Sequence, residues 1–140
     1  MALDLSAISR FCVIRIPFKF SGQTFEERKR FVALGHFNNH AICLKATSKV
    51  AIYQNNPEKM AGCVYYGSGE TALFERDTAI QPDNQIPIHH DQLENALIAG
   101  TLEIMGTLPL DFEAKLRVAI ENSTTLDDRR RSRLIALLNC

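Results

Sequence analysis

The sequence predicts a mainly β chain of the α+β class, in which a small twisted β-barrel or a compact sandwich is followed by two or three helices. Short β-rich runs separated by turn residues occupy the chain up to residue 88. From Asp91 onward the apolar residues recur at helical spacing instead. We therefore expect residues 11–88 to be mainly strand and residues 91–138 mainly helix, within a single domain that spans residues 1–140.

The first expected strand is Phe11–Ile16, which stops at Pro17 because proline cannot donate a hydrogen bond to a sheet ladder. The segment 21–30 begins with Ser-Gly-Gln and ends in a run of charges. We expect it to form a loop, and long loops on small domains often have a function.

The next two expected strands are Phe31–Leu34 and Ala41–Leu44, and the residues between them include Asn38 and Asn39. Asparagine favours the left-handed backbone angles of tight turns, so the two strands are predicted to form a hairpin. Val50–Tyr53 and Cys63–Tyr66 are two further expected strands. Leu73–Phe74 and Thr78–Ile80 surround a charged stretch, and a turn is expected at residues 82–84, which gives five or six short strands in all.

Three helices are expected after Pro87. Asp91 begins the first, whose apolar positions continue to Met105. Asp111 begins the second, and the third lies between residues 125 and 138. The apolar positions of the first two helices exceed what one small barrel covers, which predicts a homodimer. These positions are Leu93, Leu97, Leu102, Phe112 and Leu116.

The charge of the chain is balanced overall but uneven locally. Lys plus Arg and Asp plus Glu each number 16 in 140 residues, so attraction of the whole chain to nucleic acid or to an acidic membrane is not indicated. Residues 11–49, however, contain seven basic and two acidic residues, whereas residues 50–97 contain two basic and seven acidic ones. A basic region of this kind can bind phosphate without a basic pI.

The four cysteines form no CxxC pair, and three of them lie in apolar runs, which predicts free thiols in a reducing compartment. The start of the chain lacks the pattern of a secretion signal, and no apolar run is long enough to cross a bilayer. We expect a cytoplasmic protein that has no contact with membranes.

The predicted hairpin brings Arg30, just before its first strand, close to Thr47 and Ser48, just after its second. Strands about 4.8 Å apart place a long arginine side chain within reach of two hydroxyl groups. The sequence thus predicts an anion-binding patch of Arg30, Thr47 and Ser48, and the alternative is a solvated loop beside an ordinary strand end. Three lysines would add to the local potential: Lys29, Lys45 and Lys49.

Two other kinds of site fit the sequence less well. His36, His40 and Cys43, with His89 and His90, suggest a metal site, but a hairpin turn need not direct these side chains to one point, so no metal or other cofactor is expected. A cysteine hydrolase is not favoured either, because Cys43 and Cys63 occupy positions of buried strands, where a thiolate is disfavoured.

The stretch DDRRRSR at residues 127–133 places four arginines near the end of the chain. On a helix Arg129 and Arg133 share one face, and Arg130 and Arg131 point elsewhere. Most runs of this kind are solvated, and a minority bind an RNA backbone or an acidic partner segment.

The hairpin resembles a pattern in the PemK/MazF family of bacterial toxins. A basic pair, Lys29-Arg30, leads into an apolar strand, and the second strand ends in Thr47-Ser48 followed by a polar residue. The stretch TAIQPDNQIPI, residues 78–88, is similar to the family's strand that returns to the barrel. The resemblance covers residues 11–88 and implies a small twisted β-barrel of the PemK/MazF type.

The resemblance implies a metal-independent endoribonuclease without a cofactor, whose RNA substrate is cleaved by attack of the ribose 2′-hydroxyl on the adjacent phosphate. Arg30 would stabilise the transition-state charge, because its planar guanidinium binds two phosphate oxygens, and Thr47 and Ser48 would donate hydrogen bonds. The implied partners are RNA, an antitoxin protein and a second copy of the chain. The alternative is a non-catalytic member of the fold that binds protein or nucleic acid.

Overall fold

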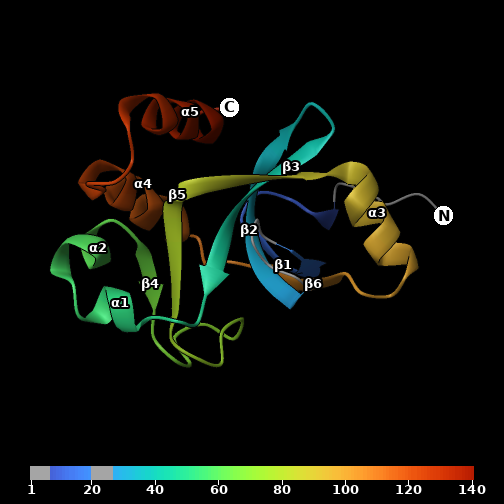
Figure 1. The fold of residues 1–140 in the computed structure, drawn as a ribbon, viewed down its shortest axis with the longest axis horizontal. Helices are drawn as coiled ribbons and strands as arrows, with labels where there is room; N and C mark the ends of the chain where they lie inside the picture. Colours follow the sequence, from blue (N-terminus) through green and yellow to red (C-terminus); the bar gives the residue numbers. More distant parts are fainter. Residues whose placement is uncertain (1–6, 20–26) are drawn as a thin grey trace.

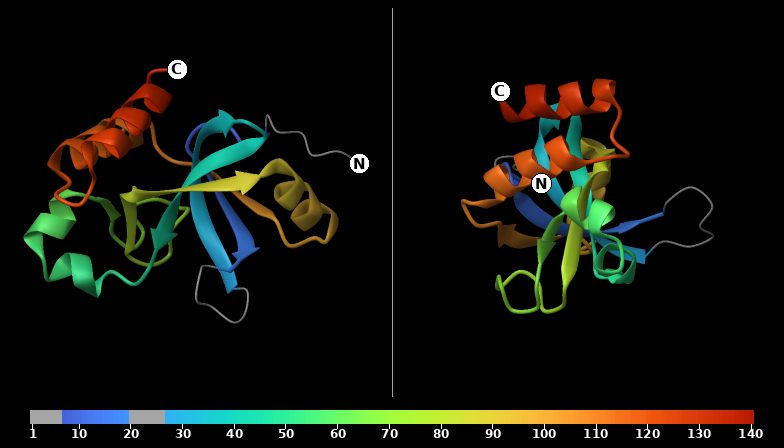
Figure 2. Two further views of the ribbon diagram at one scale, coloured as in Figure 1. Left: turned by 45° about the horizontal axis from the view of Figure 1, so that its top comes forward. Right: turned by 90° about the vertical axis from the view of Figure 1, so that its left-hand side faces the viewer.

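The computed structural model describes residues 7–19 and 27–140, and in these ranges six strands form one antiparallel sheet. Figures 1 and 2 show that the sheet twists strongly and curls into a half-barrel. The spatial order of the strands is β4-β5-β3-β2-β1-β6. Their bounds are β1 (Cys12–Phe18), β2 (Glu27–Phe37), β3 (His40–Thr47), β4 (Val64–Tyr66), β5 (Thr78–His89) and β6 (Glu103–Thr107).

Five helices accompany the sheet in the described ranges. The longer helices lie at its two ends, with α4 and α5 at one end and α3 at the other (Figure 1). Within these ranges no helix is both long enough and apolar enough to cross a membrane. The helices are α1 (Ala51–Gln54), α2 (Pro57–Ala61), α3 (His90–Ile98), α4 (Phe112–Asn122) and α5 (Asp128–Leu138).

The two faces of the sheet cover separate apolar cores, because successive side chains of a strand point to opposite faces. Val32 and Leu34 of β2 pack in one core with Leu116 of α4 and Leu134 of α5. This side is called the α4–α5 face. Phe31 and Ala33 pack in the other core with Ile14 of β1 and Leu93 of α3, and this side is called the α3 face.

The predicted hairpin is confirmed as strands β2 and β3, which turn at Asn38 and Asn39 with positive φ angles of 48° and 61°. β2 begins at Glu27, earlier than expected, so the basic residues 28–30 belong to a strand and not to a loop. Residues 20–26 of the expected loop lie outside the described residues.

The expected strand at Val50–Tyr53 is wrong, because most of this segment forms the short helix α1. The next helix, α2, begins at Asn56-Pro57. The Asn56 side chain accepts hydrogen bonds from the backbone N–H groups of Glu58 and Lys59. An N-cap asparagine followed by proline at the first helical position is a helix-start pattern that the sequence already contains.

The expected turn at residues 82–84 is also wrong, because β5 continues through it from Thr78 to His89. The pairing with β3 shifts between Ile80 and Gln85, so the strand contains an irregularity at this point instead of ending. Leu73 and Phe74, on the N-terminal side of the charged stretch, precede this strand in the chain. These residues lie in a loop, and Phe74 is buried in the core of the α4–α5 face.

The first C-terminal helix ends at Ile98, well before Met105. Gly100 has a φ of 75°, and residues 103–107 form β6, which pairs with β1. The expected extension of this helix to Met105 is therefore wrong, because edge pairing with β1 overrides the helical spacing. The other two expected helices are confirmed as α4 and α5, although Asp127 caps α5 in place of Thr125.

Candidate functional site

An arginine-lined groove of about 400 Å³ lies beside strands β1, β2 and β6. One wall comes from the strands, and the other comes from the loop that follows β4 and includes residues 72–76. This space is called the arginine groove. Its lining residues are Arg15, Arg28, Arg30, Ala72, Leu73, Glu75, Arg76, Glu103 and Met105.

Arg15 and Arg30 form the centre of the strand wall. They are directly opposite each other in the antiparallel pairing of β1 with β2. Both point to the α4–α5 face, since each is two residues from a valine that is buried there, Val13 and Val32 respectively. Like charges directly opposite each other in a sheet repel, and an anion placed between the two guanidinium groups would relieve this repulsion.

Burial and a third arginine, Arg76, strengthen the electrostatic repulsion that acts on the Arg30 guanidinium. Its guanidinium carbon lies 5.3 Å from the centre of the Phe74 ring, which is buried. Burial is the main cause that lowers the pKa of Arg30, and the charges of Arg15 and Arg76 lower it further. Three arginines thus interact electrostatically in a partly desolvated place, where each unit of charge acts more strongly than in water.

Two glutamates reduce the positive charge of the groove without cancelling it. Glu103 of β6 forms an ion pair with Arg28 at 3.3 Å between Oε2 and Nη2. Glu75 lines the opposite wall. Four arginines against two glutamates leave the lining with net positive charge, and the planar guanidinium groups can each bind two phosphate oxygens.

Thr47 and Ser48 do not join Arg30 in this groove, although they lie at the same end of the hairpin. Arg30 pairs with Ala46, whose side chain packs in the core of the α4–α5 face. Thr47 follows Ala46 on β3 and therefore points to the other face of the sheet. Its hydroxyl oxygen accepts a hydrogen bond from the backbone N–H of Lys49 at 3.1 Å, and Ser48 is exposed.

The three predicted lysines gather on the side of Thr47. Lys29 forms an ion pair with Glu27 at 2.6 Å. The pKa of Glu27 is lowered mainly by this hydrogen bond, with further contributions from Lys29, Lys49 and Lys45. Burial and the charges of Lys29 and Lys49 lower the pKa of Lys45. The residues predicted as one anion site are thus divided between the two faces, with Arg30 on one and the lysines on the other.

The sequence-based prediction missed Arg15 and Arg76 as partners of Arg30. The sequence does indicate Arg15, because it is a charged residue in an otherwise apolar strand. It lies two residues after Val13 and therefore points to the same face of the sheet. Arg76 lies in an irregular loop, where no periodicity indicates the direction of a side chain.

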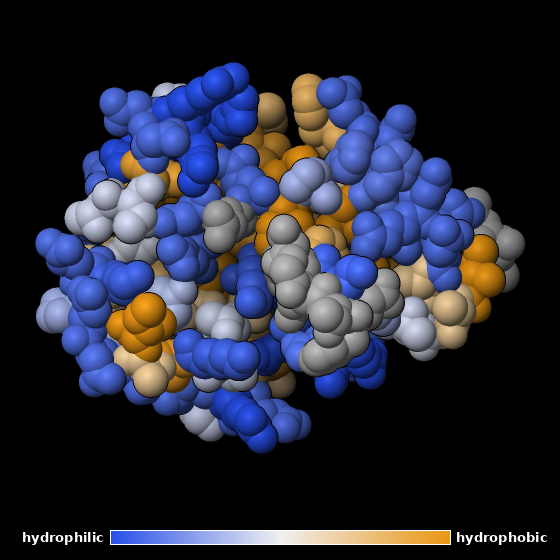
Figure 3. Space-filling model, in the orientation of Figure 1, coloured by the Kyte–Doolittle hydropathy of each residue, from blue (hydrophilic) through white to orange (hydrophobic). Residues whose placement is uncertain are grey.

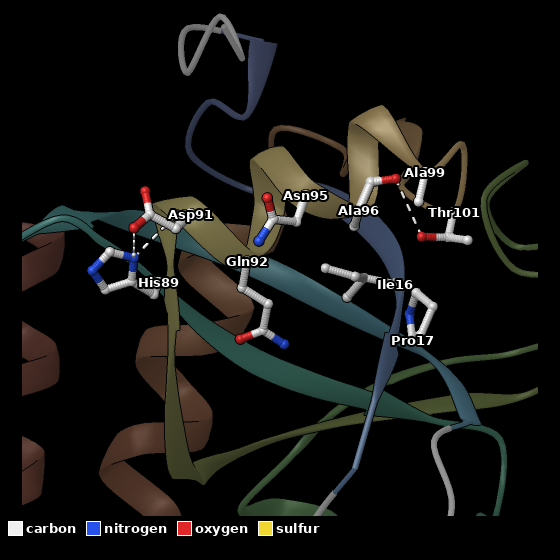
Figure 4. Close-up of a pocket in the computed structure, with 9 residues that line it drawn as sticks. All are labelled: Ile16, Pro17, His89, Asp91, Gln92, Asn95, Ala96, Ala99 and Thr101. Atoms are coloured by element: carbon white, nitrogen blue, oxygen red, sulfur yellow. Dashed lines mark hydrogen bonds and ion pairs between the residues drawn. The ribbon is translucent and has the colours of Figure 1, made fainter.

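A second polar pocket, of about 560 Å³, lies between α3 and the end of β1 (Figure 4). The carboxamide side chains of Gln92 and Asn95 extend from α3, and Ile16 and Pro17 belong to β1. His89 at the start of α3 accepts a hydrogen bond from the Asp91 backbone N–H at 3.0 Å. Among the residues that the structure describes, no arginine or lysine lines this pocket, so the arginine groove is the better candidate for an anion.

The four histidines of the chain lie close together where the hairpin turn meets the start of α3. His36 Nδ1 lies 3.0 Å from His90 Nε2, and the rings of His40 and His89 are 4.8 Å apart between centroids. Nevertheless, no group of three or more histidines, cysteines, aspartates or glutamates in the described ranges is placed to bind a metal ion.

Cys43 and Cys63 are buried, as expected from their strand-like surroundings. Burial raises the pKa of Cys43 to about 12 and that of Cys63 to about 11. Both thiols are therefore protonated near neutral pH, which makes them poor nucleophiles.

Fold and groove together define a curled antiparallel sheet with an arginine-lined groove at one end of its central hairpin. No model of a known protein family matches the chain, and no curated protein matches it significantly. The assignment of a function therefore depends on the groove itself and on the resemblance noted in the hairpin.

Proposed function

We propose that the chain binds the phosphate backbone of RNA in the arginine groove. The observation that supports this most is the pair of half-buried arginines, Arg15 and Arg30, opposite each other on one face of the sheet. Without an anion their repulsion costs free energy, and with a phosphate between them the same charges stabilise a complex. Arg28 and Arg76 extend the positive surface along the groove.

The size of the groove and the resemblance to the PemK/MazF family favour RNA over a small anion. A space of about 400 Å³ is larger than a single phosphate needs, and it is open to solvent so that a chain can pass through it. The family resemblance supplies the choice of RNA and the proposal of a barrel of the PemK/MazF type. Arg30, the residue that the resemblance assigns to charge stabilisation, lies in the groove.

A second candidate, cleavage of the bound RNA, is favoured by Glu75, a carboxylate that lines the groove opposite the strand wall. In this reaction Glu75 accepts the proton of the 2′-hydroxyl, and the 2′-oxygen attacks phosphorus. The bond to the 5′-oxygen breaks, and that oxygen takes a proton from water. Arg30 and Arg15 stabilise the negative charge that develops on the phosphate. Thr47, on the other face, and Ser48, which does not line the groove, take no part.

Binding is tested by fluorescence anisotropy with a labelled single-stranded RNA 20-mer in a series of salt concentrations. We expect Arg30→Gln and Arg15→Gln each to weaken binding about tenfold and to reduce the salt slope by about one phosphate contact. Lys59→Gln is the matched control, because Lys59 is an exposed cation on α2, away from the groove. Equal affinity of the wild type and both arginine variants would exclude the groove as the RNA site.

Cleavage is tested with the same RNA in the presence of EDTA. Products with a 5′-hydroxyl end, formed by the wild type and not by Glu75→Gln or Arg30→Gln, would support the endoribonuclease. If the wild type binds this RNA and a mixed RNA pool without cutting either, the non-catalytic alternative holds and the binding proposal is unaffected.

The homodimer and an antitoxin partner are proposed from the family resemblance alone. The apolar stripe that also suggested a dimer is largely used within the chain, since Leu93, Phe112 and Leu116 are fully buried in its own cores. Sedimentation velocity at micromolar concentration tests the dimer, and a monomeric mass would exclude it.

A further inference from the structure

An elongated groove lies between α5 and the β2–β3 hairpin, and the proposed function does not use it. Its wider part has a volume of about 690 Å³ and its narrower part about 330 Å³. The two parts are adjacent, and Ile42, Gln85 and Arg133 line both. This space is called the α5 groove. It lies toward the turn end of the hairpin, whereas Arg30 and the arginine groove lie near the start of β2.

The wider part of the α5 groove is apolar. Its walls are Gly35 and Ile42 on the hairpin and Ala136 and Leu137 on α5. Phe37, at its edge, is 65% exposed, which is unusual for an aromatic side chain. Hydrophobic atoms are visible at the bottom of the notch at the top of Figure 3, between the end of α5 and the hairpin.

The narrower part is basic along its α5 side. Arg130 and Arg133 line it, one helical turn apart. Both residues are exposed. Arg130 is also paired with Asp127 at 3.5 Å and donates a hydrogen bond to the carbonyl oxygen of Asp83. Asp83 also lines this part, but its carboxylate accepts hydrogen bonds from the hydroxyl groups of Ser123 and Thr125.

The arginines of the run at residues 129–133 have different surroundings. Arg131 is structural, since it donates hydrogen bonds to the carbonyl oxygens of Ser123 and Leu126 and thereby holds the turn between α4 and α5. Arg129 is exposed and lines neither part of the α5 groove. Within this run, Arg130 and Arg133 line the groove. Arg10 lines the wider part, and its guanidinium donates hydrogen bonds to the carbonyl oxygens of Leu137 and Leu138.

We propose that the α5 groove binds an extended segment of a partner protein that combines apolar residues with acidic ones. The apolar residues occupy the wider part beside Phe37 and Leu137, and the acidic residues pair with Arg133 and Arg130. The groove follows α5 from Arg130 to Cys140, which is about 15 Å at 1.5 Å per residue. An extended peptide of four or five residues covers this distance.

Charge complementarity and shape favour this occupant over a small molecule. Arg130 and Arg133 line the narrower part, whereas the wider part is mainly apolar and its Arg10 guanidinium already donates to carbonyl oxygens of α5. A ligand that uses both the exposed arginine charge and the apolar surface therefore spans both parts. Small-molecule pockets enclose most of their ligand, whereas this groove is open along its length. Apolar anchors beside exposed arginines are the features that interfaces with peptides use.

The test is selection of a phage-displayed library of random dodecapeptides on the immobilised wild-type chain. Enriched sequences are synthesised, and their affinities are measured by fluorescence anisotropy for four proteins: the wild type, Arg133→Glu, Ala136→Gln and Arg129→Glu. Arg129→Glu is the matched control, because it reverses the same charge on the same helix outside the groove. Circular dichroism verifies that each variant is folded.

We expect the enriched peptides to combine Leu, Ile or Phe with Asp or Glu within five residues. They should bind the wild type and Arg129→Glu equally, and Arg133→Glu and Ala136→Gln at least about tenfold more weakly, with affinity that falls as salt rises. Three results would overturn the proposal: no enrichment, enriched peptides without acidic residues, or equal binding to all four proteins. Binding of a fatty acid that depends on Arg133, without any peptide, would assign the groove to a small amphiphile instead.

Discussion

Arg15 and Arg30 lie directly opposite each other on strands β1 and β2, and both point to the α4–α5 face of the sheet. Oppositely charged or apolar pairs are the usual choice at such positions, because like charges repel at this distance. The nearest compensating carboxylate along the sheet is Glu103, which is paired with Arg15 in the ladder but forms its ion pair with Arg28. Arg15 thus has a like charge opposite it on β2 and Glu103 opposite it on β6, and we expect the arginine pair to cost stability in the free protein.

This cost predicts that inorganic phosphate stabilises the protein more than chloride does at equal ionic strength. At a phosphate concentration ten times its Kd, mass action contributes about 1.4 kcal/mol to the free energy of unfolding. For a chain of this size, Tm should rise by about 3–5 °C in a thermal scan. In Arg30→Gln the rise should disappear, since the phosphate loses one of its two opposed partners.

The same scan includes Lys59→Gln, which should keep the full phosphate response. If phosphate and chloride give the same Tm for the wild type, the arginine pair does not bind phosphate. If Arg30→Gln responds as strongly as the wild type, phosphate stabilises the protein from another place.

The placement of Thr47 leads to a prediction that separates the two faces of the sheet. Thr47→Val removes the hydroxyl that accepts a hydrogen bond from the Lys49 N–H, at an exposed strand end. We expect RNA affinity to change less than twofold, because Thr47 and the arginine groove are on opposite faces. An anisotropy titration measures this. A tenfold loss in Thr47→Val with no loss in Arg15→Gln would place the RNA on the lysine side.

The central hairpin is the part of the fold that the sequence predicts best. Its signals are local: two apolar runs and a double asparagine that accepts positive φ angles. The sheet around it depends on distant contacts that no local pattern reports. Residues 103–107 have apolar positions compatible with a helix, yet they form β6 because β1 offers a free edge and Gly106 adopts a φ of 142°.

For the candidate site, the sequence predicts which end of the hairpin Arg30 and Thr47 occupy, but not which face of the sheet each side chain is on. Topology correctly places Arg30 and Thr47 at the same end of the hairpin, since antiparallel strands must return there. The face on which a side chain lies follows from the alternation of residues along a strand. Because β2 begins at Glu27, Arg30 belongs to the strand, and this alternation fixes the direction of its side chain. An Arg30 in a loop could have turned toward Thr47, whereas an Arg30 in a strand cannot.

Arg10 should be important for the attachment of α5. Its guanidinium donates hydrogen bonds to the carbonyl oxygens of Leu137, Leu138 and Cys140, at 2.9, 2.9 and 3.1 Å. A cation at the C-terminal end of a helix also interacts favourably with the helix dipole. Arg10→Met should lower the free energy of unfolding by about 1–2 kcal/mol in urea titrations.

Hydrogen exchange identifies where this loss occurs. In Arg10→Met the backbone amides of the last turn of α5 should exchange faster, while those of β2 and β3 keep their protection relative to global stability. Arg10→Lys should recover part of the loss, because a single ammonium group cannot satisfy all three carbonyls. If Arg10→Met is as stable as the wild type, water replaces the guanidinium without cost.

The histidine cluster predicts a loss of stability in mildly acidic solution. His36 Nε2 lies 2.8 Å from the carbonyl oxygen of Ile8 and donates to it, so His36 Nδ1 accepts a hydrogen bond from His90 Nε2. Burial lowers the pKa of His90 from its ordinary value near 6.5, and His36, His89 and His40 lower it further, while Asp91 acts in the opposite direction. The folded protein therefore favours neutral His90.

The unfolded chain binds a proton at this histidine near pH 6.5, before the folded protein does. The stabilisation from neutral His90 is thus fully present above about pH 7.5 and is lost as the pH falls through 6.5 toward the lowered pKa. Urea midpoints measured between pH 7.5 and pH 5.5, above the range in which most carboxylates titrate, should decrease for the wild type. His90→Gln should flatten this dependence, and Gln92→Ala, an exposed change on the same helix, should keep it. Equal slopes for the wild type and His90→Gln would show that the acid sensitivity arises elsewhere.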